Sequence, residues 1–439
     1  MLLAEHNRAA LFDKLLPNSI AILPGAIQQY RSRNVEYPFR QNSDFYYLTA
    51  FPEPNALAVF IKQDNNPDNN QFILFNQDLD ELAQIWHGSI IGQQKAKQVF
   101  RAECAYSINQ IDQILPELLL NKQILYYPMF QNIQLETNVC NWQKIAFSKL
   151  KKSSPDYIPR TAKDLLEIVH ELRSIKSAEE LLRIRHVTEV SANAHNHIMH
   201  YVASHKNLTE KHIQAEFYSY CLQHGCHDMA YPPIAACGNN ACTLHYTKNN
   251  HVLQDNELLL LDAGAEYEYY AADITRVLPV NGKFSARQKD LYNLVLSAQK
   301  YAIEQIKPGK PWSGIQQAVV KVLVEGLIDF KILNGSADEL IRKNMYQEFY
   351  MHDSGHFLGM DVHDVGAYNL NNQSRSLVSG MVLTVEPGLY FAKNSTVPAK
   401  WQGWGIRIED DVLVTENGYE ILTKSAVKEI ADIEHLMIN

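Results

Sequence analysis

The chain has 439 residues, of which 46% are hydrophobic and 20% are charged, and its formal net charge is -9. This length exceeds what one hydrophobic core usually serves, so we expect two domains in an ordinary soluble globular protein. The negative charge argues against nucleic acid or an anionic membrane as the main partner.

Three features of the sequence indicate the compartment: the start of the chain, the length of its apolar runs and its cysteines. The first residues lack the basic end and apolar stretch of a secretory signal peptide, and no apolar run approaches the length of a membrane span. The six cysteines do not make a disulfide framework in a chain this long, and they suit a reducing compartment. We therefore expect a cytoplasmic protein.

Strand and helix signals alternate in the first third of the chain. A polar loop at residues 64–70 has the composition of an exposed hairpin turn. The hydrophobic runs typical of short strands are 19–23, 56–61, 72–75 and 124–127. This alternation predicts an α/β domain over residues 1–172, without an obvious catalytic cluster.

A helical pattern with one interruption follows. Acidic residues are interleaved with leucine and isoleucine from residue 162 onward, and the pattern continues to about residue 200. Ser177 and Glu180 have the spacing of a capping box, which indicates that a new helix begins there. We place the domain boundary just before this box, so that the second domain covers residues 173–439.

The second domain places aspartates where a strand should be apolar. Asp262 follows four leucines, and Asp273 precedes the segment 274–277. Aspartate is depleted in strands, and an unpaired buried carboxylate is costly. A hairpin with its tip near residues 266–268 would bring the two carboxylates together, so that one must be protonated or a cation must lie between them. For either aspartate alone, a role at a strand end or turn is the better interpretation.

Three later segments change that interpretation. His356 follows a short polar stretch, Glu386 ends an apolar strand at 381–385, and Arg407 and Glu409 share one face of another predicted strand. Two aspartates, one histidine and two glutamates are a ligand set for a pair of hard or borderline divalent ions. The set favours manganese, with cobalt, zinc or iron as alternatives.

These segments resemble the pita-bread metallopeptidase family and, within it, aminopeptidase P. The segments that carry the resemblance are 262–276, His356, 385–388 and 407–410 in the second domain, with 39–49 and 85–88 in the first. The resemblance covers nearly the whole chain. It implies an α/β N-terminal domain and an α+β pita-bread catalytic domain. The implied activity is release of the N-terminal residue from peptides with proline in the second position.

The resemblance also implies a role for each ligand. Asp262 would bind one metal ion, His356 and Glu386 would bind the other, and Asp273 and Glu409 would bridge both. A hydroxide between the two ions, with Mn²⁺ as the expected metal, would attack the bond before proline. Glu386 would carry a proton from that water to the leaving imino nitrogen.

Five further residues surround the implied ligands. His245 and His363 would steady the substrate carbonyl and the tetrahedral oxyanion. His352, Tyr390 and Arg407 would form the walls of the pocket for the proline ring. Taken singly, His245, His352 and Arg407 would more often be satisfied polar residues, and only the whole constellation favours a functional role.

Two positions bear on assembly and on the chemistry of the site. A tryptophan from a neighbouring subunit can close the proline pocket in this family, and Trp86 matches it, which implies a homo-oligomer, a tetramer or a dimer. The alternative for Trp86 is a partly buried aromatic residue of its own domain. Asp353 stands where the family often has an apolar phrase, and we expect this extra acid to affect metal affinity or the pH optimum.

Other activities share parts of this pattern. A prolidase, which cleaves only dipeptides ending in proline, has the same fold, ligands and bond. A methionine aminopeptidase lacks a large N-terminal domain of this kind, and a creatinase-like hydrolase lacks the metals. A non-catalytic module that binds peptides or proteins is an alternative from another class. The complete ligand set argues against it, because buried acids are costly without a cation.

Overall fold

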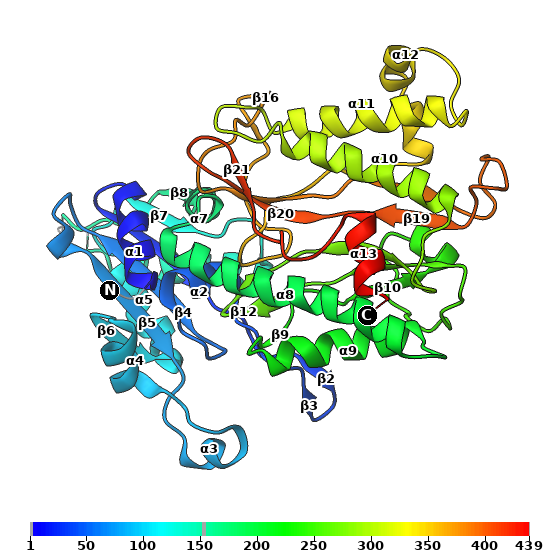
Figure 1. Ribbon diagram of the computed structural model, residues 1–439. Helices are drawn as coiled ribbons and strands as arrows, with labels where there is room; N and C mark the ends of the chain where they lie inside the picture. The colour runs from blue at the N-terminus through cyan, green and yellow to red at the C-terminus, as the bar shows by residue number, and fades with distance from the viewer. Residues whose placement is uncertain (1–2, 152–154, 439) are drawn as a thin grey trace. The chain divides into compact units, whose positions relative to one another are not determined.

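The structure is a computed structural model that describes residues 3–151 and 155–438 (Figure 1). The chain forms two compact units, Met1–Leu172 and Arg173–Asn439. No helix among the described residues is long and apolar enough to cross a membrane.

A six-stranded mixed sheet forms the centre of the N-terminal unit, in the order β6-β5-β4-β1-β7-β8. β1 pairs antiparallel with β4 and parallel with β7. Every residue of β4 is buried, and accordingly the strand is apolar without alternation from Leu57 to Ile61. The strands of this unit are β1 Ser19–Pro24, β2 Tyr30–Ser32, β3 Val35–Glu36, β4 Leu57–Lys62, β5 Gln71–Asn76, β6 Cys104–Ser107, β7 Ile124–Tyr127 and β8 Thr161–Asp164.

Helices connect and cover these strands. They are α1 Leu3–Lys14, α2 Ser43–Thr49, α3 Glu81–His87, α4 Gly92–Phe100, α5 Ile111–Leu118, α6 Ile133–Lys149 and α7 Leu166–Ser174. The prediction of a helix from residue 162 is wrong for its first residues, because Thr161–Asp164 pairs with β7 as a parallel strand. Sheet pairing overrides the local helical pattern there, and α7 begins at Leu166.

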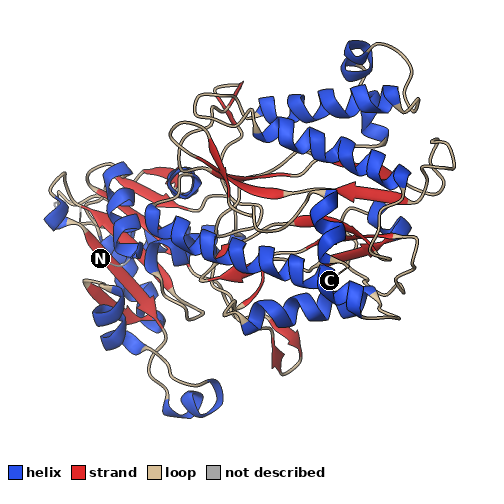
Figure 2. Ribbon diagram, in the orientation of Figure 1, coloured by secondary structure: helices blue, strands red, loops and turns tan. Residues whose placement is uncertain are grey.

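The C-terminal unit has an α+β arrangement. Its strands lie between the helix pair α8–α9 and the pair α10–α11 (Figure 2). The predicted capping box at the start of α8 is confirmed, with Ser177 as N-cap and Glu180 bonding back to it. The helices are α8 Ala178–Ser204, α9 Glu210–Gln223, α10 Ala286–Ile303, α11 Ser313–Asp329, α12 Ala337–Arg342 and α13 Ile430–Leu436.

Short strands of this unit build several small sheets. β11 is the centre of one sheet and pairs antiparallel with β10 and β14, with Asp262 opposite Thr275. The chain turns at Glu268 and Tyr269, which have φ of 46° and 72°. The strands are β9 Asp228–Met229, β10 Ile234–Cys237, β11 Leu258–Asp262, β12 Ala265–Tyr267, β13 Tyr270–Ala271, β14 Thr275–Pro279, β15 Asn369–Leu370, β16 Gln373–Ser374, β17 Val382–Val385, β18 Gly388–Phe391, β19 Trp404–Arg407, β20 Asp410–Val414 and β21 Tyr419–Ile421.

The expected single strand through Arg407 and Glu409 is two strands. β19 ends at Arg407 and pairs with β18, whereas β20 begins at Asp410 and pairs with β17 and β21. Glu409 lies in the break and forms an isolated bridge with Thr275. The prediction of one continuous strand is therefore wrong, because the chain passes from one sheet to the next at this point.

Candidate active site

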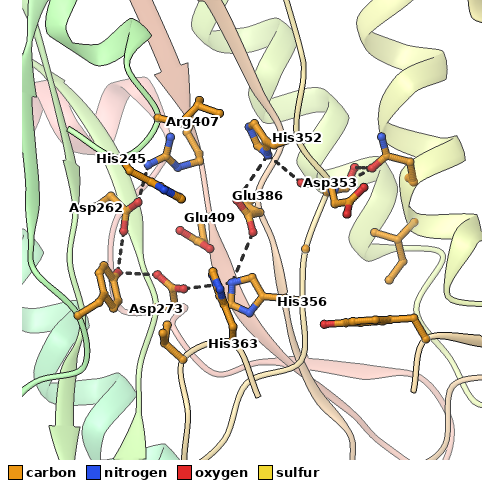
Figure 3. A pocket seen from close by; sticks show the side chains of 18 of the residues that line it. His245, Asp262, Asp273, His352, Asp353, His356, His363, Glu386, Arg407 and Glu409 are labelled. Carbon is orange, nitrogen blue, oxygen red and sulfur yellow. Dashed lines mark hydrogen bonds and ion pairs between the residues drawn. The ribbon is translucent and has the colours of Figure 1, made fainter. Parts of the chain in front are cut away.

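A cavity of about 930 Å³ opens in the C-terminal unit, and all of its lining residues belong to that unit (Figure 3). The five predicted metal ligands line it together with four other predicted site residues. These nine are Asp262, Asp273, His356, Glu386, Glu409, His245, His352, His363 and Arg407. Residues more than 140 positions apart in the sequence thus line the same cavity.

The four acidic residues among the predicted ligands lie at or near the ends of strands. Asp262 is the last residue of β11, Glu386 follows β17, and Glu409 precedes β20. Asp273 lies between β13 and β14, so the predicted hairpin does bring it beside Asp262. Asp262, Asp273 and Glu409 are all buried. Figure 3 shows these carboxylates converging on one region of the cavity.

Three of the predicted ligands form the tightest group. One ligand atom from each of Asp273, His356 and Glu409 lies within 4.8 Å of the others. The Nε2 atom of His356 is 3.3 Å from Asp273 and 3.5 Å from Glu386. Its Nδ1 atom lies 3.0 Å from the Phe357 carbonyl oxygen. This second contact orients the ring so that Nε2 faces the acids, as is usual for histidines that bind metals.

Close backbone approach sets the position of His356. Its main-chain N–H donates to the Thr384 hydroxyl at 3.0 Å, and the Thr384 main-chain N–H donates to the His356 carbonyl oxygen at 2.9 Å. Gly355 makes this approach possible, because a Cβ atom there would lie 2.0 Å from the Thr384 carbonyl oxygen. The Glu386 N–H donates to the Ser354 carbonyl oxygen at 2.9 Å, which ties the two ligand-bearing segments together.

Hydroxyl groups that the sequence analysis missed also contact the acids. The Tyr231 hydroxyl lies 2.7 Å from Asp262 and 2.5 Å from Asp273, so it bridges the two aspartates. The Thr275 hydroxyl donates to Glu409 at 2.6 Å. Thr275 lies in the segment that carries the resemblance, and its alternation with Asp273 could have identified it. Tyr231 begins an irregular Tyr-Pro-Pro segment that gives no such signal.

The acids carry more negative charge than their surroundings balance. Burial raises the pKa of Asp262, and it raises the pKa of Glu386 to about 7. Burial, followed by repulsion from Asp273 and Glu386, raises the pKa of Glu409 well above its ordinary value. Four carboxylates and one imidazole are donors that hard or borderline divalent ions prefer. The residues present therefore fit a divalent metal site.

Positive groups close to the acids are Arg407 and His356. Arg407 forms an ion pair with Asp262. Burial acts to lower the pKa of His356, but its hydrogen bond to Asp273 and the charge of Glu386 raise it to about 9. A bound cation would take over the role of that proton.

His352, Tyr390 and Arg407 form a connected wall. The Tyr390 hydroxyl lies 2.8 Å from His352 Nε2 and accepts a hydrogen bond from Arg407 at 3.0 Å. Burial and the charge of Arg407 lower the pKa of His352 to about 4, so its imidazole is neutral near pH 7. Tyr390 itself is not among the residues that line the cavity.

The other predicted residues lie in different surroundings. His363 stacks edge-on against His356 with ring centres 4.2 Å apart, and burial and His356 lower its pKa. His245 is exposed to the cavity from the loop after β10, and Asp353 also lines the cavity. Trp86, in α3, is 82% exposed and does not line the cavity. The alternative of a partly buried aromatic residue is therefore wrong for Trp86.

Comparison with known proteins identifies the family and the fold. Residues 183–416 match the sequence profile of Metallopeptidase family M24, and residues 4–126 match that of the aminopeptidase P N-terminal domain. The chain belongs to metallopeptidase family M24. The predicted α/β N-terminal domain and pita-bread catalytic domain are confirmed, as is the metallopeptidase class.

Several known proteins match this chain over nearly its whole length. It is 40% identical to the Xaa-Pro aminopeptidase of Escherichia coli K12, a match that covers 99% of this chain and 97% of that protein. The structure of Pseudomonas aeruginosa aminopeptidase PepP has a TM-score of 0.95 and 42% identity, with 99% and 97% of the two chains covered. Escherichia coli aminopeptidase P with the inhibitor Pro-Leu has a TM-score of 0.93 and 40% identity, covering 99% and 98%.

Proposed function

We propose that this M24 metallopeptidase is an Xaa-Pro aminopeptidase, which hydrolyses the bond between the N-terminal residue and a proline in second position. The observation that carries the proposal is the cavity in which four carboxylates and His356 meet without enough cations to balance them. The full-length similarity to Xaa-Pro aminopeptidases supports the substrate class.

We further propose that two divalent ions, Mn²⁺ by preference, occupy this cavity. Asp262 would hold one ion, His356 and Glu386 the other, and Asp273 and Glu409 both. Such ions lower the pKa of a water molecule and polarise the scissile carbonyl group. One structure of Escherichia coli aminopeptidase P is described as zinc-substituted, so several metals remain candidates for this chain.

The side chains around the proposed ligands would handle the proton and the substrate. Glu386 would accept a proton from the attacking water and deliver it to the imino nitrogen of the leaving proline. His245 and His363 would donate hydrogen bonds to the substrate carbonyl and to the oxyanion that forms from it. His352, Tyr390 and Arg407 would hold the proline ring, whose fixed shape suits a rigid wall of linked side chains.

Charge in the cavity favours peptides longer than two residues over the prolidase alternative. A dipeptide Xaa-Pro carries its carboxylate directly on the proline, and a prolidase needs a cation to bind it. Arg407 is the only Lys or Arg among the described lining residues, and it is already bonded to Asp262, Tyr390 and Thr275. The volume of about 930 Å³ is also at the upper end for a small-ligand site, which leaves room beyond proline.

Assembly and compartment complete the proposal. Trp86 is large, apolar and 82% exposed, which suits a residue that a homo-oligomer, a tetramer or a dimer, would bring to the proline pocket of another copy. All six cysteines are free, which supports a cytoplasmic location. Asp353 is expected to affect metal affinity or the pH optimum from its place in the lining.

The test is the release of the first residue from Ala-Pro-Ala and from Ala-Pro by metal-stripped and Mn²⁺-loaded protein. We expect metal-dependent cleavage of the tripeptide and its loss in Glu386→Ala. Activity on the dipeptide alone would make the protein a prolidase. Cleavage of neither peptide, with two ions bound, would refute proline specificity.

A further inference from the structure

A buried glutamate outside the cavity holds the loop that carries His245. Glu210 is the first residue of α9, and its side chain is 0% exposed. It does not line the cavity and belongs to none of the proposed ligand or substrate contacts. A buried carboxylate in this position requires hydrogen-bond partners, because its transfer out of water is costly unless new hydrogen bonds replace those to water.

Four neutral donors surround the Glu210 carboxylate. Oε1 accepts from the Cys237 N–H at 2.7 Å and from the Asn240 side chain at 2.9 Å. Oε2 accepts from the Tyr246 hydroxyl at 2.8 Å and from the His251 N–H at 2.8 Å. All four donors lie in one segment, residues 237–251.

That segment has little regular structure of its own. Cys237 ends β10, the short 3₁₀ helix Gly238–Cys242 follows, and residues 243–251 are irregular. The Glu210 main-chain N–H also donates to the His251 carbonyl oxygen at 2.9 Å. Glu210 therefore contacts the segment near its start, its middle and its end, and replaces the ladder of hydrogen bonds that a strand would have.

The side chains of His245 and Tyr246, in the middle of the segment, lie in different surroundings. Leu244, His245 and Thr247 line the cavity, whereas Tyr246 is buried and bonded to Glu210. Because His245 and Tyr246 are consecutive, fixing the tyrosine hydroxyl fixes the direction of the histidine. The burial of Glu210 and the position of His245 thus depend on the same set of hydrogen bonds.

We propose that Glu210 is a positioning residue that acts on catalysis through Tyr246 and His245. The inference rests on the proposed function, in which His245 contacts the substrate. Whatever the activity, the segment 237–251 is held less firmly without the Glu210 carboxylate, although Asn249 still ties it to the neighbouring main chain.

The experiment is a double-mutant cycle of Glu210→Gln and His245→Ala, assayed on Ala-Pro-Ala with Mn²⁺-loaded protein. A glutamine side chain keeps the size but turns an NH₂ group toward donors. We expect Glu210→Gln to lower kcat by roughly tenfold to a hundredfold with little change in KM, since small misplacement of a catalytic group has costs of this size. In the His245→Ala background the same change should cost less than about twofold, because coupled residues are not additive.

Equal losses in the two backgrounds, or no loss of kcat in Glu210→Gln, would overturn the proposal. Tyr246→Phe removes one of the four donors and should give a smaller loss with the same non-additivity, which keeps the test open if Glu210→Gln folds poorly. Glu136→Gln is a matched control. Glu136 also accepts from a tyrosine hydroxyl and a main-chain N–H, both at 2.8 Å, but within the N-terminal unit. It should leave kcat unchanged.

Amide hydrogen exchange of residues 237–251 separates this inference from the proposed function. We expect faster exchange there in Glu210→Gln than in the unmodified protein, whatever the activity. Unchanged exchange would refute the positioning role. An inactive but otherwise normal protein with faster exchange in the variant would refute the aminopeptidase proposal and leave the loop assignment standing.

Discussion

Glu409 and Asp410 are adjacent, both are buried, and their surroundings differ sharply. Asp410 forms an ion pair with Arg276 at 2.7 Å and another with Lys428. Burial acts to raise the pKa of Asp410, but these two cations lower it below its ordinary value. Burial and the neighbouring acids instead raise the pKa of Glu409. The two carboxylates point to opposite sides of an extended chain, one to internal cations and one to the cavity.

Asp410 is thus a structural acid, paired with cations of the protein itself, whereas Glu409 is a site acid, which lines the cavity. Arg276 also donates to the Glu409 carbonyl oxygen and, at 3.0 Å, to that of Thr275. The cluster around Asp410 therefore fixes the main chain that carries Glu409 and Thr275. The Asp410 side of this extended chain is balanced by the protein's own charges, and the Glu409 side faces the cavity in which we propose that metal ions bind.

The largest effect is expected for Glu409→Gln. Losing a bridging ligand should lower kcat/KM by more than the roughly hundredfold that an outer-shell partner typically costs. The melting temperature of the metal-free protein should stay level or rise, because the change removes one of several repelling acids. Differential scanning calorimetry in a chelator and peptide assays with Mn²⁺ measure the two quantities. A clear drop in metal-free stability would contradict the assignment of Glu409 as a site acid.

Asp410→Asn should act in the opposite way. It leaves Arg276, which is 0% exposed, without its charged partner, and such losses lower the free energy of unfolding by roughly 3–5 kcal/mol. Urea unfolding of the metal-free protein measures this free energy. If Asp410→Asn were no less stable than the unmodified chain, the contrast between the two neighbours would fail.

Tyr231→Phe probes the bridge between Asp262 and Asp273. Removing the hydroxyl should weaken metal affinity or activity by about tenfold to a hundredfold, the usual range for an outer-shell partner. Tyr292→Phe is the matched control, because it deletes a buried hydroxyl that bonds to the Lys428 carbonyl oxygen away from the cavity. Equal losses of affinity in both variants would indicate a general packing effect.

A smaller effect is expected from pH in the metal-free protein. The folded chain raises the pKa of Glu386 from 4.5 to about 7 and that of His356 from 6.5 to about 9. It therefore holds protons that the unfolded chain has released, and stability from these groups is lost as pH rises between about 4.5 and 9. Below about pH 6.5 the lowered pKa of His352 acts in the opposite direction, so the test is made above it. Melting temperatures from pH 7 to 9 should fall in a chelator and fall less with Mn²⁺. A parallel course in both conditions would argue against metal binding at these residues.

Much of this arrangement could be predicted from the sequence because acids in apolar strands are costly and therefore informative. Asp262, Asp273, Glu386 and Glu409 were identified in this way, and the hairpin at Asp262 followed from turn spacing. The contacts of loop residues and of residues at helix starts could not be predicted in this way. A glutamate in the first turn of a helix usually does no more than stabilise the helix through its dipole. Glu210 and Tyr231 gain their roles from three-dimensional contacts alone.

The break between β19 and β20 at Ile408 could not be predicted from the sequence pattern either. Ile406 and Ile408 are both buried, so the two-residue period continues through the break. Only the pairing partners change, from β18 to β17 and β21, and partner choice depends on residues far away in the chain. The side of the strand on which Arg407 and Glu409 lie was nevertheless predicted correctly, because both line the cavity.

The most direct test of the central claim is calorimetric titration of the metal-free protein with Mn²⁺, with Glu409→Gln and Asp410→Asn beside it. We expect two ions per chain in the unmodified protein and in any folded Asp410→Asn, and weakened or incomplete binding in Glu409→Gln. Binding that is absent from the unmodified protein, or unchanged in Glu409→Gln, would contradict the claim that the unbalanced acids of this cavity form a two-metal site.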